Sequence, residues 1–513
     1  MLQTRAAERP MASDPAPSQV TVPWRAERWV FLVLGAVALV AFCVGAGAKG
    51  VFGDEAYSLS TALRSWGSLW DHVRNHETNG LLYAALLRMW SELGDSLTWL
   101  RYLSALFAAG AVVATAALAR SVASLRAAVI AGSLLIFNGA VLNFAQQIRG
   151  YSLVLLLSSL SCLVFVSQVR RPTNAKLVGW AVLAVLLAAT NLISFVVIGG
   201  QLASLVFVPR ERRQLGRWAV ATAAVLPVPL VLMWLVNQHP EGQNLLALQL
   251  WAVRDAVLTL SGRGFVLGLA GSAVLAALGL RAAFRRGTRY LVTPEGWPLA
   301  FLMSAVLVPL AGLAVLSLVQ PAIIGRYLAF ALPLVAVFGA IGLDDAFRTV
   351  RPTARVARAA LWVGTAVVVA GSLAGVAWWH RGGDIQDFEG AADLVFDQAQ
   401  PGDSILFAWD DARLFFEHEA TDHAGASLVT PRFPAGDWGT FGTGDQAYET
   451  FPPATVEALV QDAPGRVWVV VDGLRAEDAD LASLAQLDDA GWTVQTQTFD
   501  GEVDVRLYVP PTS

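Results

Sequence analysis

Long apolar stretches alternate with short polar connections over the first three quarters of the chain, and this pattern changes near residue 380. A run of about 20 apolar residues is long enough to cross a bilayer as an α-helix. The crossings expected from such runs are 29–48, 97–119, 126–144, 152–169, 215–236, 264–281, 297–319, 327–346 and 359–379. The pattern therefore predicts a polytopic α-helical membrane protein.

Two further apolar stretches differ in length from a single membrane span. The stretch 177–208 is too long for one pass, is interrupted at Thr190-Asn191 and has basic residues at both ends. We therefore expect two short passes with a turn at Asn191, which leaves both basic ends on one side. The stretch 80–93 is short and contains Arg88, so we expect it to lie in the membrane interface or to re-enter beside the second span. This interpretation gives about eleven crossings.

Basic residues predict the orientation of the chain. Arg and Lys gather before the first span and in every second connection after it, at 120–126, 170–176, 210–217, 281–289 and 348–358. Because cytoplasmic loops are enriched in Lys and Arg, we expect a multi-pass protein of the cell membrane with a disordered cytoplasmic N-terminus (1–28). The transmembrane domain is 29–379, and its loop 49–96 is expected on the outer face.

The region 380–513 has a different periodicity and is expected outside the cytoplasm. Its pattern predicts helices at 387–398 and 476–490, strands at 404–409 and 466–471, and strand-like runs over 493–509. Alternating helices and strands in this length predict a small α/β domain. Its sequence contains no Gly-rich phosphate loop, metal-spaced Cys or His cluster, or serine elbow. We expect it to bind or cover a ligand rather than to carry separate chemistry.

Composition excludes a soluble globular protein. Of the 513 residues, 55% are hydrophobic and only 15% are charged, which is too little polar surface for a soluble domain of this size. The two cysteines, Cys43 and Cys162, lie far apart within apolar runs and predict no disulfide framework.

Acidic residues and imidazoles gather in the expected outer loop. Asp54 and Glu55 begin it, and His72, His76 and Glu77 lie near its other end. Such groups could deprotonate a hydroxyl or hold a divalent cation. The alternative is an ordinary hydrated loop, which we prefer for His72. Because the loop is tethered to the membrane at both ends, a functional role is favoured for Asp54.

Two arginines are expected on the same outer face, each close to a tyrosine. They are Arg149, followed by Tyr151, and Arg326, followed by Tyr327. A guanidinium group offers two parallel donors to a phosphate. The alternative is a snorkelling helix anchor with an interfacial tyrosine. Together with Asp54, the two arginine-tyrosine motifs favour a site that binds an anion.

These motifs, taken in order, resemble a known family. Gly53-Asp54-Glu55-Ala56-Tyr57, Gln146 to Leu155, Arg326-Tyr327-Leu328 and Asp387 to Ala392 are similar to the polyprenyl-phosphate-dependent glycosyltransferases of the GT-C type. The branch in question is the protein-mannosyltransferase-like one (family 39), which includes the aminoarabinose transferases acting on lipid A. The resemblance implies transfer of a sugar, with inversion, from a polyprenyl-phosphate donor to an acceptor hydroxyl of a protein, glycan or glycolipid. No nucleic-acid partner is expected.

The resemblance also implies roles for the residues named above. Asp54 matches the general base or orienter of the acceptor, and Glu55 is its neighbour in the acidic motif. Arg149 and Arg326, with Tyr151 and Tyr327, would bind the donor phosphate and stabilise it as the leaving group.

The chain departs from the family pattern at two places. Gln147 stands where much of the family has an acid, so a second catalytic carboxylate is absent at that position. His76-Glu77 stands where His-Pro-Pro is common, which leaves these two residues as acceptor or metal ligands. Whether a divalent metal cation takes part is left open by the sequence.

Two other classes compete with this interpretation. A transporter or flippase of a lipid-linked sugar needs ionisable groups along a path through the membrane and often has repeated halves. The expected spans are nearly free of charge and show no repeat. A structural or sensory membrane protein would leave the outer Asp and Arg residues unexplained.

Overall fold

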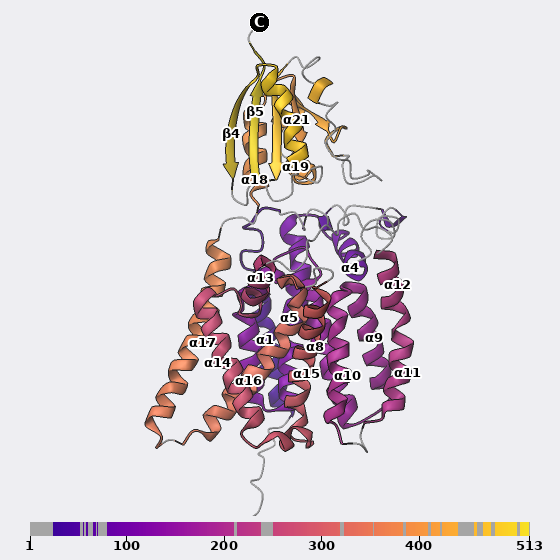
Figure 1. Cartoon of the computed structure of the whole chain (residues 1–513), viewed down its shortest axis with the longest axis vertical. Coiled ribbons are helices and arrows are strands. Elements are labelled where there is room, and N and C mark those ends of the chain that lie inside the picture. The colour runs from indigo at the N-terminus through magenta and orange to yellow at the C-terminus, as the bar shows by residue number, and fades with distance from the viewer. Residues whose placement is uncertain are drawn as a thin grey trace, which may run out of the picture.

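The computed structural model describes most of the chain. The described residues are 24–51, 55, 58–59, 65–67, 69, 80–209, 213–236, 250–318, 323–351, 353–382, 386–408, 412–420, 423–439, 456–458, 465–472, 478–499 and 503–511. A bundle of helices supports a small sheet domain at one of its ends (Figure 1). We call this the domain end of the bundle, and the other the distal end.

Helices make up the whole of the bundle within the described ranges. They are α1 (Trp24–Cys43), α4 (Leu81–Ser91), α5 (Leu97–Val122), α6 (Leu125–Ile136), α7 (Gly139–Ala145), α8 (Tyr151–Arg170), α9 (Asn174–Thr190), η1 (Ile193–Phe195), α10 (Val196–Ala203), η2 (Ser204–Phe207), α11 (Leu215–Val225), α12 (Pro227–Val236), α13 (Leu250–Leu260), α14 (Phe265–Phe284), η4 (Thr288–Val292), α15 (Trp297–Leu316), η5 (Gly325–Ala331), α16 (Leu332–Thr349) and α17 (Arg355–Arg381).

The polytopic helical fold is confirmed, but the number of crossings is not. Within the described residues, seven helices are long and apolar enough to cross a membrane, or eight if α6 and α7, bent by 65°, form one span. The expected count of about eleven also relied on the first span and on the two short passes of 177–208. Those two passes appear as the shorter apolar segments Asn174–Thr190 and Ile193–Phe207.

The helix break predicted at Asn191 is present. α9 ends at Thr190, and Asn191 adopts an extended backbone with φ of −160°. Its side-chain oxygen accepts a hydrogen bond from the backbone N–H of Ser194 at 3.0 Å, so the amide caps the turn that follows. α9 and α10 then lie in the same part of the bundle (Figure 1).

The stretch 80–93 forms α4 at the domain end of the bundle (Figure 1). Its 11 residues reach about 16 Å at 1.5 Å per residue, well short of a hydrocarbon core of about 30 Å. Tyr83 and Leu87 bury one face of the helix against the bundle. The length agrees with an interfacial or re-entrant helix.

Close helix packing depends on small residues. α5 packs against α1, α6 and α8 through a series of buried alanines that includes Ala105, Ala108 and Ala116. α14 crosses α17 at glycines, since a Cβ on Gly371 would lie 2.5 Å from the carbonyl oxygen of Leu267. Such close approach of backbones is the usual means by which helices associate in membranes.

The sheet domain contains five strands and three longer helices within the described residues. Its elements are α18 (Phe388–Asp397), β1 (Asp403–Phe407), α19 (Ala412–Ala420), η6 (Ala424–Leu428), β2 (Val429–Phe433), β3 (Val467–Asp472), α21 (Asp478–Asp489), β4 (Thr493–Phe499) and β5 (Val503–Val509). The strand order is β2-β1-β3-β5-β4. β1 runs parallel to β2 and β3, and β5 runs antiparallel to β3 and β4.

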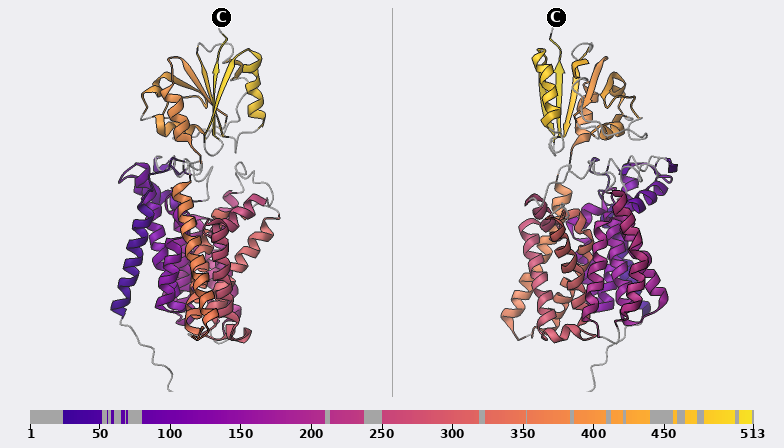
Figure 2. Two further views of the ribbon diagram at one scale, coloured as in Figure 1. Left: turned by 90° about the vertical axis from the view of Figure 1, so that its left-hand side faces the viewer. Right: turned by 45° about the vertical axis from the view of Figure 1, so that its right-hand side comes forward.

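Helices cover both faces of this sheet (Figure 2). Alternate residues of a strand point to opposite faces, and Trp468 and Val470 of β3 pack with α18 and α19. Val467, Val469 and Val471 pack instead with α21. The small α/β domain is confirmed. The sequence pattern missed β2, whose Pro431 is a residue found on edge strands, and it missed α19.

Asp403 is a deeply buried acid of this domain. It is 1% exposed, and its Oδ2 accepts hydrogen bonds from Arg466 at 2.6 Å and from the Trp468 indole at 3.0 Å. Burial by itself raises the pKa of this carboxyl, but the hydrogen bonds from Arg466, Trp468 and the Gln400 backbone outweigh burial and lower the pKa below its ordinary value.

We expect this carboxylate to make the sheet domain sensitive to acid. Because its pKa is lower in the folded than in the unfolded chain, it stabilises the fold above about pH 4 and loses that effect as the pH falls through the folded-state value. The unfolding temperature of the purified full chain should therefore fall as the pH drops below about 4, and less steeply in Asp403→Asn. Asp397→Asn, at an exposed position of α18, should follow the wild type; equal pH dependence of all three proteins would contradict the assignment.

Candidate functional site

The predicted site residues are only partly within the described ranges. Asp54, His76 and Glu77 lie outside them. Glu55, Arg149 and Tyr151 are described, as are Arg326 and Tyr327. The following contacts therefore concern the second acid of the acidic motif and the two arginine-tyrosine motifs.

Glu55 forms a buried ion pair with Arg101. The Glu55 side chain is 0% exposed and that of Arg101 is 2% exposed, with 2.6 Å between Oε2 and a terminal guanidinium nitrogen. The guanidinium Nε also donates to Oε1 at 3.0 Å, so the contact is bidentate. A buried pair of this geometry fixes both side chains, because separating them would leave a charge without its partner in an apolar environment.

Arg101 also binds the backbone that precedes the acidic motif. Its terminal nitrogens donate to the carbonyl oxygens of Ala46 at 2.9 Å, Lys49 at 2.7 Å and Gly50 at 2.8 Å. Val51, the next residue, belongs to the apolar core of the sheet domain. One arginine on α5 thus holds the segment that joins α1, the sheet domain and Glu55.

Glu55 is in turn connected to the turn before α8. Its Oε1 accepts a hydrogen bond from the backbone N–H of Ile148 at 2.7 Å. Gln146 in the same turn donates to the carbonyl oxygens of Phe42 and Val44, and it accepts from the Trp379 indole at 2.5 Å. The structure therefore brings the acidic motif together with the Gln146 to Arg149 motif, although about 90 residues separate them in the chain.

Arg149 lies at the end of this turn and is half-buried. Its guanidinium donates to the hydroxyl of Ser58 at 3.3 Å, three residues after Glu55. The guanidinium carbon is 5.9 Å from the centre of the Tyr151 ring. Arg149 is thus next to the segment that contains the acidic motif.

Arg326 belongs to η5 and is also half-buried. Its guanidinium carbon lies 5.7 Å from the centre of the Tyr327 ring. η5 packs against α8, the helix that begins at Tyr151, and against α13. Each arginine therefore lies close to a neighbouring tyrosine, and the helix that follows Arg149 contacts the element that contains Arg326.

Sequence reasoning missed Arg101. It lies within the apolar run 97–119, and a charged residue inside such a run is itself a signal of a buried partner or a functional site. The partner could not be identified from the sequence, because Glu55 is 46 residues away and only the packing of α5 against the preceding loop brings the two together.

The possible binding of a divalent cation concerns residues that lie mostly outside the described ranges. Among them, no three His, Cys, Asp or Glu side chains form a group that could hold a metal ion. His76 and Glu77 lie outside these residues, so their role as acceptor or metal ligands stays a prediction.

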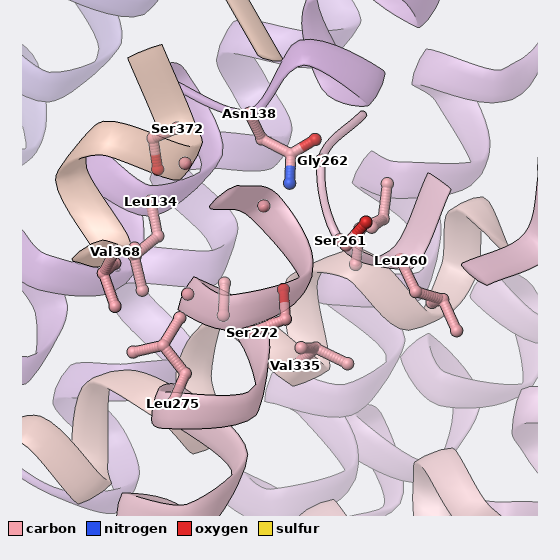
Figure 3. A pocket seen from close by; sticks show the side chains of 15 residues that line it. Leu134, Asn138, Leu260, Ser261, Gly262, Ser272, Leu275, Val335, Val368 and Ser372 are labelled. Atoms are coloured by element: carbon pink, nitrogen blue, oxygen red, sulfur yellow. The ribbon is translucent and has the colours of Figure 1, made fainter. Parts of the chain in front are cut away.

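A separate pocket lies between α6, the turn before α14, α14 itself, α16 and α17 (Figure 3). It is small, with a cavity volume of about 50 Å³. Its walls are mostly apolar, with short polar side chains contributed by Asn138, Ser261, Ser272 and Ser372. None of the predicted site residues lines it.

Comparisons with known proteins give no match to a family model or to a curated protein sequence. Solved structures do match over nearly the whole chain. ArnT from Cupriavidus metallidurans in the apo state has 15% identity and a TM-score of 0.58, with 94% of this chain and 98% of that chain covered. The same protein bound to undecaprenyl phosphate has 14% identity and a TM-score of 0.57, with the same coverage.

The structure of a second protein also matches this chain. The archaeal oligosaccharyltransferase AglB from Archaeoglobus fulgidus, in complex with an inhibitory peptide and a dolichol-phosphate, has 13% identity and a TM-score of 0.53. The alignment covers 95% of this chain and 75% of that chain. The chain therefore has the GT-C fold of these membrane glycosyltransferases.

Proposed function

We propose that the protein is an integral membrane glycosyltransferase that moves a sugar from a polyprenyl-phosphate donor to an acceptor hydroxyl. The observation that carries the proposal is the contact network of Glu55, which connects the acidic motif to the turn containing Arg149. An acid for the acceptor and cations for the phosphate are the two groups that this reaction needs. The solved ArnT and AglB structures hold undecaprenyl phosphate and a dolichol-phosphate.

The proposed reaction is a direct displacement. The acceptor hydroxyl oxygen forms a bond to the anomeric carbon while the bond from that carbon to the phosphate oxygen breaks, which inverts the configuration. Asp54 receives the hydroxyl proton, and the lipid phosphate leaves with the bonding electrons. Arg149 and Arg326 stabilise the charge that develops on the phosphate, and they do so best if they are held in place beforehand.

Glu55 is proposed as a positioning residue in this scheme. Its two carboxylate oxygens accept three hydrogen bonds, two from Arg101 and one from Ile148. Because the side chain is buried and both of its oxygens already bind donors, the role we propose for Glu55 is to hold the acidic motif in place.

The reaction is proposed to take place on the outer face of the cell membrane, at the domain end. Arg281 and Arg285 lie at the other end of α14 and pair with Asp345. Arg348 lies three residues after Asp345 on α16 and pairs with Asp344. Because Arg-rich connections are retained in the cytoplasm, this supports a cytoplasmic distal end and an extracytoplasmic sheet domain.

The function is tested by incubating the purified full chain in detergent with undecaprenyl phosphates that carry mannose, aminoarabinose, arabinose or galactose. We expect release of undecaprenyl phosphate from at least one donor, measured by mass spectrometry with and without a chelator of divalent cations. Release without a gradient or a second compartment separates an enzyme from a transporter or flippase. Failure to release it from any donor, with a folded protein and a suitable acceptor extract present, would contradict the proposal.

A further inference from the structure

Asp255 on α13 contacts the backbone of the segment that contains Arg326. Its Oδ2 accepts a hydrogen bond from the backbone N–H of Gly325 at 2.9 Å. Its Oδ1 accepts from a terminal nitrogen of Arg263 at 2.7 Å. Both carboxylate oxygens are thus engaged, one by the backbone next to Arg326 and one by a counter-ion.

The approach of Gly325 to α13 allows no side chain. A Cβ at this position would lie 2.3 Å from Oδ2 of Asp255 and 2.4 Å from Oγ1 of Thr259. Thr259 is fully buried, so it has little room to move. The backbone of Gly325, at the start of η5, is therefore in close contact with α13. Because Arg326 is the next residue, this contact determines the position of its backbone.

Asp255 is itself anchored by Arg263. The guanidinium carbon of Arg263 lies 4.9 Å from the centre of the Trp378 ring on α17, a distance typical of a cation–π contact. The Arg263 backbone has φ of 56°, a region that non-glycine residues seldom occupy. The carboxylate is thus held by the start of η5 and by the turn after α13, and Arg263 of that turn lies against Trp378 of α17.

The charge of this pair suits a site for an anion. A lone carboxylate beside Arg326 would weaken the attraction of that arginine for a phosphate. Arg263 compensates the negative charge of Asp255, so the pair can hold the backbone without opposing a bound anion. The engagement of both oxygens also argues against Asp255 as a general base.

We propose that Asp255 is a positioning residue that fixes Gly325 and thereby directs Arg326 toward the phosphate of the lipid donor. This inference rests on the proposed function. Asp255 acts through the backbone and does not touch the phosphate. The role of Arg263 is to keep the Asp255 carboxylate in the rotamer that accepts from Gly325.

Binding of undecaprenyl phosphate to the purified full chain tests the inference, with undecaprenol as the uncharged control ligand. We expect Asp255→Ala to weaken binding of undecaprenyl phosphate by about 10- to 100-fold, the range for loss of a hydrogen bond to a charged group. Binding of undecaprenol should not change. Asp255→Asn keeps an oxygen that can accept from Gly325, so its loss should be smaller. The unfolding temperature of each variant is measured alongside.

A double variant shows whether Asp255 acts through Arg326. If it does, Asp255→Ala combined with Arg326→Ala should bind undecaprenyl phosphate as weakly as Arg326→Ala alone, and no weaker. Asp345→Ala is the matched control, since this carboxylate also pairs with arginines, Arg281 and Arg285, but at the distal end. It should bind as the wild type does.

The outcomes separate the two proposals. If the wild type prefers undecaprenyl phosphate to undecaprenol but Asp255→Ala binds equally well, the inference is overturned and the proposed function stands. Fully additive losses in the double variant overturn it as well. If the wild type does not distinguish the phosphate from the alcohol, the proposed function fails and the inference fails with it.

Discussion

Arg101→Met should destabilise the protein by about 3–5 kcal/mol, the usual cost of removing one partner of a buried ion pair. Glu55 is 0% exposed and, of the three hydrogen bonds described above, would keep the one from the Ile148 N–H. The segment 46–50 would also lose the donors that now bind three of its carbonyl oxygens. The free energy is measured by reversible denaturation in detergent, or as a shift of the unfolding temperature.

Arg88→Met is the matched control for this prediction. Arg88 on α4 pairs with Glu92 at 3.4 Å, but the Glu92 side chain is 54% exposed, so water can solvate the carboxylate when the arginine is removed. The expected cost is at most about 1 kcal/mol. Equal effects of the two substitutions would show that burial does not govern the Glu55–Arg101 pair.

A double variant distinguishes the contribution of the Glu55–Arg101 ion pair from that of side-chain packing. Replacing both partners, in Glu55→Met/Arg101→Met, should cost less than the sum of the two single substitutions, because an apolar pair leaves no uncompensated charge. Glycosyl transfer should nevertheless stay low in the double variant, since the acidic motif would no longer be held to the Ile148 turn. Recovery of stability together with full activity would contradict a positioning role for Glu55.

Asp54→Asn should lower the turnover of the transferase by about 10²- to 10⁴-fold, the range expected when a general base is removed. An asparagine has nearly the same shape but cannot take the proton of the acceptor hydroxyl. Binding of undecaprenyl phosphate should be retained, because Arg149 and Arg326 are unchanged. Turnover is measured with the donor that the panel identifies, and binding is measured on the same preparations.

Asp95→Asn is the control for this second prediction. Asp95 lies at an exposed position just before α5, in the same expected outer loop as Asp54, and its substitution should leave turnover unchanged. A result in which Asp54→Asn turns over at the wild-type rate would remove Asp54 from the mechanism. Loss of both turnover and binding would instead indicate that Asp54 shapes the phosphate site.

The helical part of the fold could be predicted from local sequence. A helix must be about 20 apolar residues long to cross the hydrocarbon core of the bilayer, so most spans can be recognised directly in the sequence. The break at Asn191 follows from one polar interruption of an apolar run. The number of crossings does not follow from local sequence in the same way, because short passes such as Asn174–Thr190 do not reach that length alone and depend on burial by neighbouring helices.

The sheet domain was predicted in outline and missed in detail. The strands 403–407 and 467–472 contain the uninterrupted apolar runs 405–407 and 467–471, which is the pattern of strands buried on both faces. β2 alternates buried and exposed residues over only five positions and contains Pro431, so its local signal is weak. Its place at the edge of the sheet comes from pairing with β1.

The sequence by itself determined the membrane class of this protein, the change of character near residue 380 and the residue types that could act on a lipid phosphate. Only the tertiary structure decided that Glu55 is held by Arg101 and by the turn of Arg149, and that Asp255 fixes Gly325. The partners are separated by 46 residues for Glu55 and Arg101 and by 70 for Asp255 and Gly325. Hydrophobic periodicity reports the local environment of a residue, whereas the partner of a buried charge is determined by which helices pack together.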